Sequence, residues 1–211
     1  LMGRTCNLYL LSPEGRIIDC LRRIGLDESA KRSALPGLNY QMPEEISKEN
    51  PLECKKKIAY IPDNPDLYTF MTGIQYLHFV ADIYGVSAQI RQERIRRYAD
   101  AFNLTQDLAQ PIAAYSHGMK QKLAIISALV HNPKLLILDE PFVGLDPQAA
   151  VVLKGIMNEL CEQGGAIFFS THVLDVAEKL CNKVAIIKDG QLIRAGHMEE
   201  IVKDGESLED I

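Results

Sequence analysis

The feature that most constrains this chain is a short apolar run that ends in two acids, Leu135–Glu140 (LLILDE). Continuous apolar runs of this length are typical of strands that are buried on both faces of a parallel sheet. Apolar residues recur at helical spacing on either side of it, from Ser116 to Val130 and from Gln148 to Cys161. A strand between two helices needs crossover connections, so this region predicts an α/β fold with a mostly parallel sheet.

The same alternation continues toward the end of the sequence. A strand is predicted at 166–169, a helix at 173–180 and a further strand at 184–187. Asp189 and Gly190 form a turn signal, so the segment 191–195 is expected to return antiparallel.

Upstream, the pattern is helical and suggests a separate lobe. A short strand is predicted to end at Ile61, and three helices without an intervening strand follow between Thr72 and Val130. We therefore divide the chain into a first part of the core (1–65), an inserted all-helical lobe (66–132) and a second part of the core (133–211).

Composition excludes several classes of protein. Of the 211 residues, 47% are hydrophobic and the formal net charge is −5, as in a folded globular protein rather than a disordered chain. An acidic balance argues against nucleic acid as the main partner. The expected helix 88–102 is locally basic, but acids and glutamine interrupt its arginines, which favours a solvated face over a nucleic-acid surface.

The acids Asp139 and Glu140 have the pattern of a hydrolytic site. The carboxyl ends of parallel strands meet at one edge of a sheet, where open α/β folds bind ligands. His172 follows the next strand, so it should reach the same edge. In a nucleotide hydrolase, the first acid can hold Mg²⁺ and the second can orient the attacking water.

A second candidate lies at the start of the helix that precedes this strand. Ser116 and Gly118 offer a hydroxyl and free N–H groups at a helix N-terminus, which is a ready anion site. The alternative interpretation of Ser116 is an ordinary helix cap.

Taken in order, these segments resemble the ATP-binding subunit of an ABC transporter. The resemblance covers about residues 51–201 and rests on motifs similar to the LSGGQ signature (Tyr115–Met119), Walker B with its catalytic glutamate (Leu135–Glu140), the D-loop (Gly144–Asp146) and the switch histidine (His172). The stretches YSHGMKQK and IPDNPDLYTFMTG look most like the ATPases of bacterial exporters.

The resemblance implies a P-loop NTPase (RecA-like) fold and a set of residue roles. Glu140 and His172 would be catalytic, Asp139 would be the metal ligand, and the nucleotide would be bound by Ser116, Gly118, Asp146 and Asp63. The implied cofactors are ATP and Mg²⁺. The implied partners are a second ATPase subunit, identical or different, and a transmembrane permease subunit, with the chain in the cytoplasm against the inner face of the cell membrane.

Two departures from the family pattern concern the nucleotide. Asp63 stands where the family has the glutamine of the Q-loop. No GxxxxGK[ST] loop, which cradles the phosphates, occurs in the sequence. Leu10–Gly15 resembles the LLGPNG that opens that loop, but Ile18 then stands at the lysine position. The Walker A region is therefore missing or degenerate.

These departures keep two functions open. One is the ATP-hydrolysing subunit of an exporter. The other is a nucleotide-independent regulatory or interaction subunit that pairs with an intact ATPase. The persistence of Glu140 and His172 favours the first. The segment 66–75, rich in aromatic residues, could either receive the membrane subunit or pack the lobe's own core.

Overall fold

A computed structural model describes residues 51–188, 191–202 and 207–208. The segment 10–19, which carries the resemblance to the phosphate-binding loop, lies outside these residues. Of the first part of the core (1–65), the structure describes only residues 51–65.

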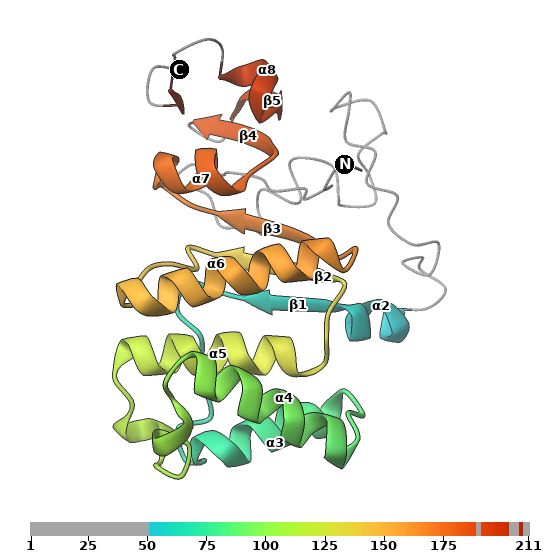
Figure 1. Cartoon of the computed structure of the whole chain (residues 1–211), viewed down its shortest axis with the longest axis vertical. Helices are drawn as coiled ribbons and strands as arrows, with labels where there is room; N and C mark the ends of the chain where they lie inside the picture. The colour runs from blue at the N-terminus through green and yellow to red at the C-terminus, as the bar shows by residue number, and fades with distance from the viewer. Residues whose placement is uncertain (1–50, 189–190, 203–206, 209–211) are drawn as a thin grey trace.

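The centre of the molecule is a parallel sheet of three strands (Figure 1). Its order is β1 (Ile58–Ile61), β2 (Leu135–Asp139) and β3 (Ala166–Ser170). The register pairs Ile61 with Leu138, and Asp139 with Ser170. The predicted parallel sheet is thus confirmed, and the carboxyl ends of its strands lie at a common edge.

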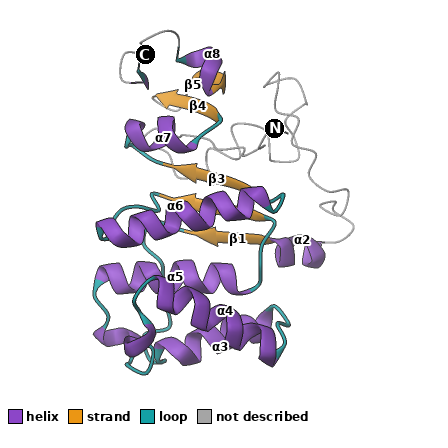
Figure 2. Cartoon of the chain, viewed as in Figure 1, coloured by secondary structure: helices purple, strands orange, loops and turns teal. Residues whose placement is uncertain are grey.

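Helices lie beside this sheet, and the part of the chain that joins β1 to β2 is made of helices and loops (Figure 2). The helices are α2 (Pro51–Lys57), α3 (Gly73–Ile83), α4 (Ala88–Ala101), α5 (His117–Val130), α6 (Pro147–Glu162), α7 (Leu174–Leu180) and α8 (Met198–Ile201), with 3-10 turns η1 (Thr105–Asp107) and η2 (Ile112–Ala114). Beyond β3, β4 (Lys183–Lys188) and β5 (Gln191–His197) pair antiparallel, as the turn signal predicts. Within the described ranges, no helix has both the length and the apolar character needed to cross a bilayer.

The lobe helices begin where the sequence signals place them. Thr72 caps α3 through a reciprocal capping box with Gln75. Gly85, at φ 66°, lets the chain turn after this helix in a left-handed conformation that favours glycine. Ser116 caps α5, whose Leu123, Ile125 and Ile126 are fully buried in the same core as the strands. Packing of α5 against β1 joins the lobe to the sheet.

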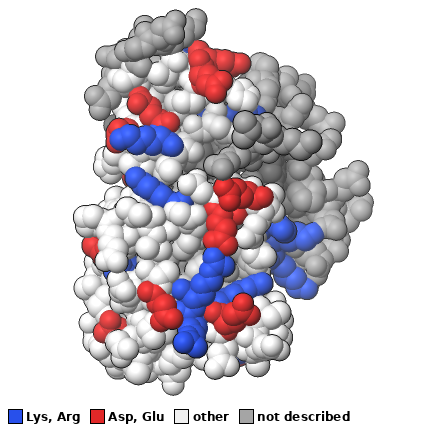
Figure 3. Space-filling model, in the orientation of Figure 1, with Lys and Arg blue, Asp and Glu red and all other residues white. Residues whose placement is uncertain are grey.

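The basic helix α4 has an exposed face, as expected, but three of its arginines also contact neighbouring helices. Arg91 pairs with Asp82 of α3 at 2.6 Å, Arg94 donates to the Val130 carbonyl of α5 at 2.7 Å, and Arg97 pairs with Glu159 of α6 at 2.5 Å. The side chains of Arg96 and Arg97 are 83% and 53% exposed, which agrees with a solvated face. The arginines tie α4 to three neighbouring helices because each extends from a different turn. Over α4 and α6, positive and negative side chains adjoin (Figure 3).

Candidate functional site

The carboxyl edge of the sheet brings Glu140 and His172 into contact. The Nδ1 atom of His172 lies 3.0 Å from Oε1 of Glu140. The Glu140 side chain is 18% exposed and that of His172 is 54% exposed, so the pair lies at the surface with the acid on its inner side. The sequence places these two residues 32 positions apart, and the parallel pairing of β2 with β3 joins them.

The backbone of Glu140 has an uncommon conformation. Its φ is 47°, in the left-handed region that non-glycine residues rarely adopt. Its N–H donates to both the carbonyl oxygen and Oγ of Ser170, each at 3.2 Å. Left-handed residues of this kind cluster at functional sites, where the surrounding structure holds them.

Asp139 lies at the end of β2, with one carboxylate oxygen already bonded. Ser170 donates its hydroxyl to Oδ1 of Asp139 at 2.5 Å. The next residue, Thr171, is buried and accepts the N–H of Val173 at 3.1 Å, which fixes the turn that carries His172. Our sequence analysis assigned Ser170 no role. The sequence signal that could have found Ser170 is a hydroxyl residue at the end of an otherwise apolar strand, next to a strand that ends in an acid.

The segment Tyr115–Met119, called the signature segment below, lies against the loop that begins at Gly144 of the same chain. Ser116 is exposed at the start of α5 and accepts the N–H of Met119 at 3.3 Å. A Cβ on Gly118 would lie 2.7 Å from the Gly144 carbonyl oxygen, and one on Gly144 (φ 78°) would lie 2.5 Å from the His117 ring. Both glycines are therefore needed for this close approach.

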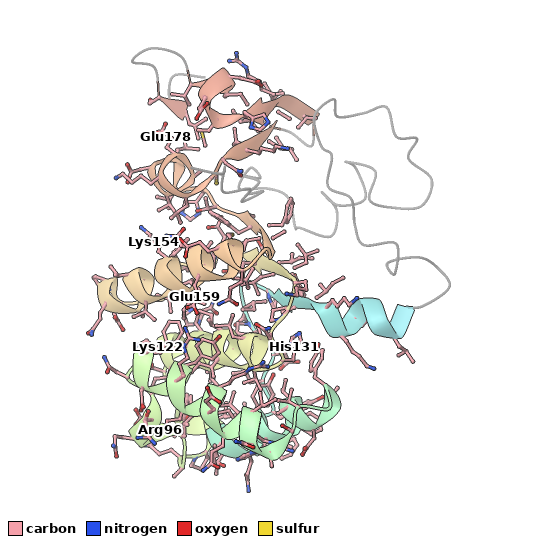
Figure 4. All side chains as sticks on the ribbon, turned by 45° about the vertical axis from the view of Figure 1, so that its right-hand side comes forward. Arg96, Lys122, His131, Lys154, Glu159 and Glu178 are labelled. Atoms are coloured by element: carbon pink, nitrogen blue, oxygen red, sulfur yellow. The ribbon has the colours of Figure 1, made fainter. Side chains whose placement is uncertain are left out.

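Asp146 joins that loop to α5 and to α6. It caps α6 by accepting the Ala149 N–H at 2.8 Å, and it pairs with Lys122 at 2.6 Å. The Lys122 ammonium and the Ala149 N–H hold the pKa of Asp146 below its usual value. Lys122, which sequence reasoning missed, is labelled on α5 in Figure 4.

Asp63 lies just beyond the end of β1 and is exposed. Because Ile61 pairs with Leu138, Asp63 shares the sheet edge with the acid pair. Among the residues described, it makes no hydrogen bond or ion pair with Asp139 or Glu140. In the same part of the chain, no three His, Cys, Asp or Glu side chains are grouped as a metal cluster.

Comparison with known proteins decides the family. The profile of the family described as "ABC transporter" matches residues 36–143, just over half of the chain. The chain belongs to the ABC transporter ATP-binding family.

Relatives and solved structures agree with this assignment. This ABC ATP-binding chain is 30% identical over 190 residues to the uncharacterized ABC transporter ATP-binding protein MJ1023 of Methanocaldococcus jannaschii, covering 90% of the chain and 70% of that protein. It is 33% identical over 151 residues to the linearmycin resistance ATP-binding protein LnrL of Bacillus subtilis, covering 72% of the chain and 48% of LnrL. A solved structure titled "Structure of ATP binding subunit of ABC transporter" superposes with a TM-score of 0.79 at 32% identity, covering 97% of the chain and 85% of that structure. The ABC chain spans about half the length of several curated relatives that it matches.

Proposed function

We propose that this ABC chain is the ATP-hydrolysing subunit of an exporter, acting as a dimer that drives a transmembrane permease. The observation that carries the proposal is the 3.0 Å contact between Glu140 and His172 at the sheet edge, beside Asp139. In this arrangement Glu140 accepts a proton from the attacking water, and His172 keeps the carboxylate oriented. Without a partner such as His172, nothing would hold the carboxylate of an acid at a strand end in one orientation.

The donor set fits a magnesium nucleotide. Mg²⁺ prefers oxygen ligands and is commonly bound by one or two carboxylates together with substrate phosphates, rather than by an all-protein cage. Asp139 supplies one carboxylate. Ser170 bonds to its Oδ1, so its Oδ2 can bind the metal. The bound Mg²⁺ would neutralise charge on the phosphates. Asp63 and Asp146 are proposed as further residues at the nucleotide.

The signature segment supports the proposed dimer. Ser116 is exposed at the N-terminus of α5. Its Oγ accepts the Met119 N–H, its O–H can donate to a phosphate oxygen, and the dipole of α5 favours anions at this end. Gly118 keeps the backbone close to Gly144. We propose that this surface binds ATP that is held by a second ATPase subunit, identical or different.

An aromatic group on the lobe is the proposed site for the permease. Phe70 is 81% exposed and Tyr68 48% exposed. Tyr68 stacks on Phe70 at 5.8 Å and meets Phe79 edge-on at 5.5 Å, which makes an apolar surface of fixed shape. A permease contact here would place the chain at the cytoplasmic face of the membrane. The name of LnrL refers to linearmycin resistance, which supports outward transport as the proposed direction.

ATP-dependent association tests the proposal. The chain is mixed with an intact ABC ATPase from the family, and sedimentation is measured with and without Mg-ATP. We expect a heterodimer with ATP, and we expect Ser116→Arg to abolish it while the variant stays folded. The matched control Thr105→Arg changes an exposed hydroxyl residue elsewhere on the lobe and should associate normally.

Association that needs no ATP would favour a regulatory subunit instead. Equal association of the Ser116→Arg variant and the parent would remove the signature segment from the interface. Ser116 would then be only the cap of α5.

A further inference from the structure

Ser170 is the one polar residue of β3, and it is almost fully buried. The other four residues, Ala166–Phe169, are apolar and buried, whereas Ser170 is 3% exposed. A buried hydroxyl is costly unless it is hydrogen-bonded, so its partners indicate why it lies there.

Both partners of the hydroxyl belong to the acid pair. The hydroxyl donates to Oδ1 of Asp139 at 2.5 Å and accepts the N–H of Glu140 at 3.2 Å. One oxygen atom thereby joins the side chain of the first acid to the backbone of the second. The direct pairing of Asp139 with Ser170 in the sheet register makes this geometry possible.

The two bonds have different consequences. The bond to Asp139 selects one orientation of its carboxylate and directs Oδ2 to a ligand. The bond to the Glu140 N–H helps hold a backbone whose φ of 47° is unfavourable for glutamate. That backbone sets the direction of the Glu140 side chain, which reaches His172 at 3.0 Å.

We propose that Ser170 is a positioning residue that orients both Asp139 and Glu140 for the metal nucleotide. The inference rests on the proposed function and names a residue that acts through these two acids. Without the hydroxyl, the Asp139 carboxylate samples several rotamers, and the Glu140 N–H keeps the Ser170 carbonyl but loses the Ser170 Oγ as acceptor.

The first experiment needs no nucleotide. The full chain is compared with Ser170→Ala, Ser170→Val and Ser170→Thr by NMR. Threonine and valine have nearly the same shape, but only threonine keeps the hydroxyl. Ser127→Ala is the matched control, because Ser127 is another buried hydroxyl and donates to Ala124 within α5.

We expect the amide exchange of Glu140 to become about tenfold faster in the Ala and Val variants, the effect of losing one hydrogen bond. The ¹³C signal of the Asp139 carboxylate should move in the same two variants. Threonine should restore both signals, and Ser127→Ala should change neither. If Ala and Val leave both signals as in the parent, the proposal is wrong. If the Val or the Thr variant does not fold, the comparison of Ser170→Ala with Ser127→Ala tests the proposal by the same two signals.

The second experiment measures Mn²⁺·ATP binding to the full chain by the EPR signal of the metal, at millimolar ligand, because a sequence without GxxxxGK[ST] is expected to bind the nucleotide weakly. We expect Ser170→Ala to weaken binding about tenfold and Ser170→Thr to restore it, since a bond to a charged group is lost. Equal binding by all variants, with changed NMR signals, would make Ser170 a structural residue only and overturn the proposal. If the parent binds no Mn²⁺·ATP, the proposed function fails at this site, and the NMR experiment alone decides whether Ser170 positions the acids.

Discussion

At the scale of single residues, the site combines a strained backbone with a specific side-chain contact. Glu140 has a φ of 47° and meets His172 at 3.0 Å, while its N–H is held by Ser170. Elsewhere in the described chain, the other non-glycine residues with positive φ are Asn103 and Asn132, which follow α4 and α5. Asparagine tolerates this conformation. Glutamate does not favour it, so the conformation supports the proposed role of Glu140.

Replacing Glu140 by glutamine should separate binding from hydrolysis. The test uses a chain whose first 50 residues are replaced by an N-terminal core with a GxxxxGK[ST] loop from a family member. Glu140→Gln keeps the size and loses the base, so we expect retained ATP binding and a turnover that falls by about 100-fold or more. The measurement is phosphate release beside a binding titration. Turnover within twofold of the rebuilt parent would leave the acid pair as a metal site only.

His131 should make the stability of the chain depend on pH. Its ring stacks on Tyr84 with centroids 3.7 Å apart, and its Nε2 lies 3.3 Å from the Ile58 carbonyl oxygen, at the end of α5 (Figure 4). Burial, with a contribution from the Arg94 charge, lowers its pKa from 6.5 to about 4. The folded chain therefore binds fewer protons than the unfolded chain between these pH values, and stability falls as the pH falls through this window.

His131→Phe keeps a ring against Tyr84 and removes the titration. Relative to this variant, the parent should lose up to about 3 kcal/mol of unfolding free energy between pH 6.5 and pH 4. Urea unfolding at pH 7.5, where the ring is neutral in both states, measures the packing cost alone. A parent–variant difference that stays constant with pH would contradict the assignment.

At the scale of elements, α4 is held by arginines rather than by apolar area alone. Within the helix the buried residues are Ile95 and Ala99, a small apolar contribution for its 14 residues. Arg91, Arg94 and Arg97 supply the additional contacts to α3, α5 and α6. Arg94 also places a positive charge at the C-terminus of α5, where the helix dipole favours it.

Arg94→Met tests this role. The side chain keeps most of its apolar stem and loses the bond to the Val130 carbonyl, so the free energy of unfolding should fall by about 1–2 kcal/mol. Arg96→Met is the matched control, because Arg96 is 83% exposed and its partner Asp100 is 3.8 Å away. It should change stability by less than about 0.5 kcal/mol. Equal losses in the two variants would mean that α4 does not depend on the Arg94 bond.

At the scale of the whole molecule, the described residues contain one part of the proposed nucleotide site. The acid pair and His172 lie at the sheet edge, and the signature segment lies at the start of α5 on the lobe. The sequence lacks the GxxxxGK[ST] loop that supplies the N–H cradle and the lysine for the phosphates.

The isolated chain should therefore bind Mg-ATP poorly. Ligand that binds weakly adds little stability, so millimolar Mg-ATP should move the melting temperature by less than about 2 °C. A thermal-shift assay measures this, with Mg²⁺ alone as the reference. A shift of several degrees would show that the segment 10–20 supplies a working substitute for the cradle.

The sequence alone determined the order of elements and the residue types of the site. Apolar runs and cap residues predict β2, β3, α3 and α5 to within a residue or two, because burial and helix-end hydrogen bonding are local properties. The parallel orientation of the strands and their shared carboxyl edge follow from the crossovers. The same reasoning placed Asp139, Glu140 and His172 together before any distance was known.

Tertiary structure decided what those residues touch. Ser170 bonds to Asp139 across 31 positions of sequence, Lys122 reaches Asp146 across 24, and Arg97 reaches Glu159 across 62. Helical periodicity predicts the exposed face of α4, but it cannot distinguish an arginine that only faces water from one that also contacts another helix. Contacts of this kind depend on how one element packs against another, so a local pattern of residues cannot predict them.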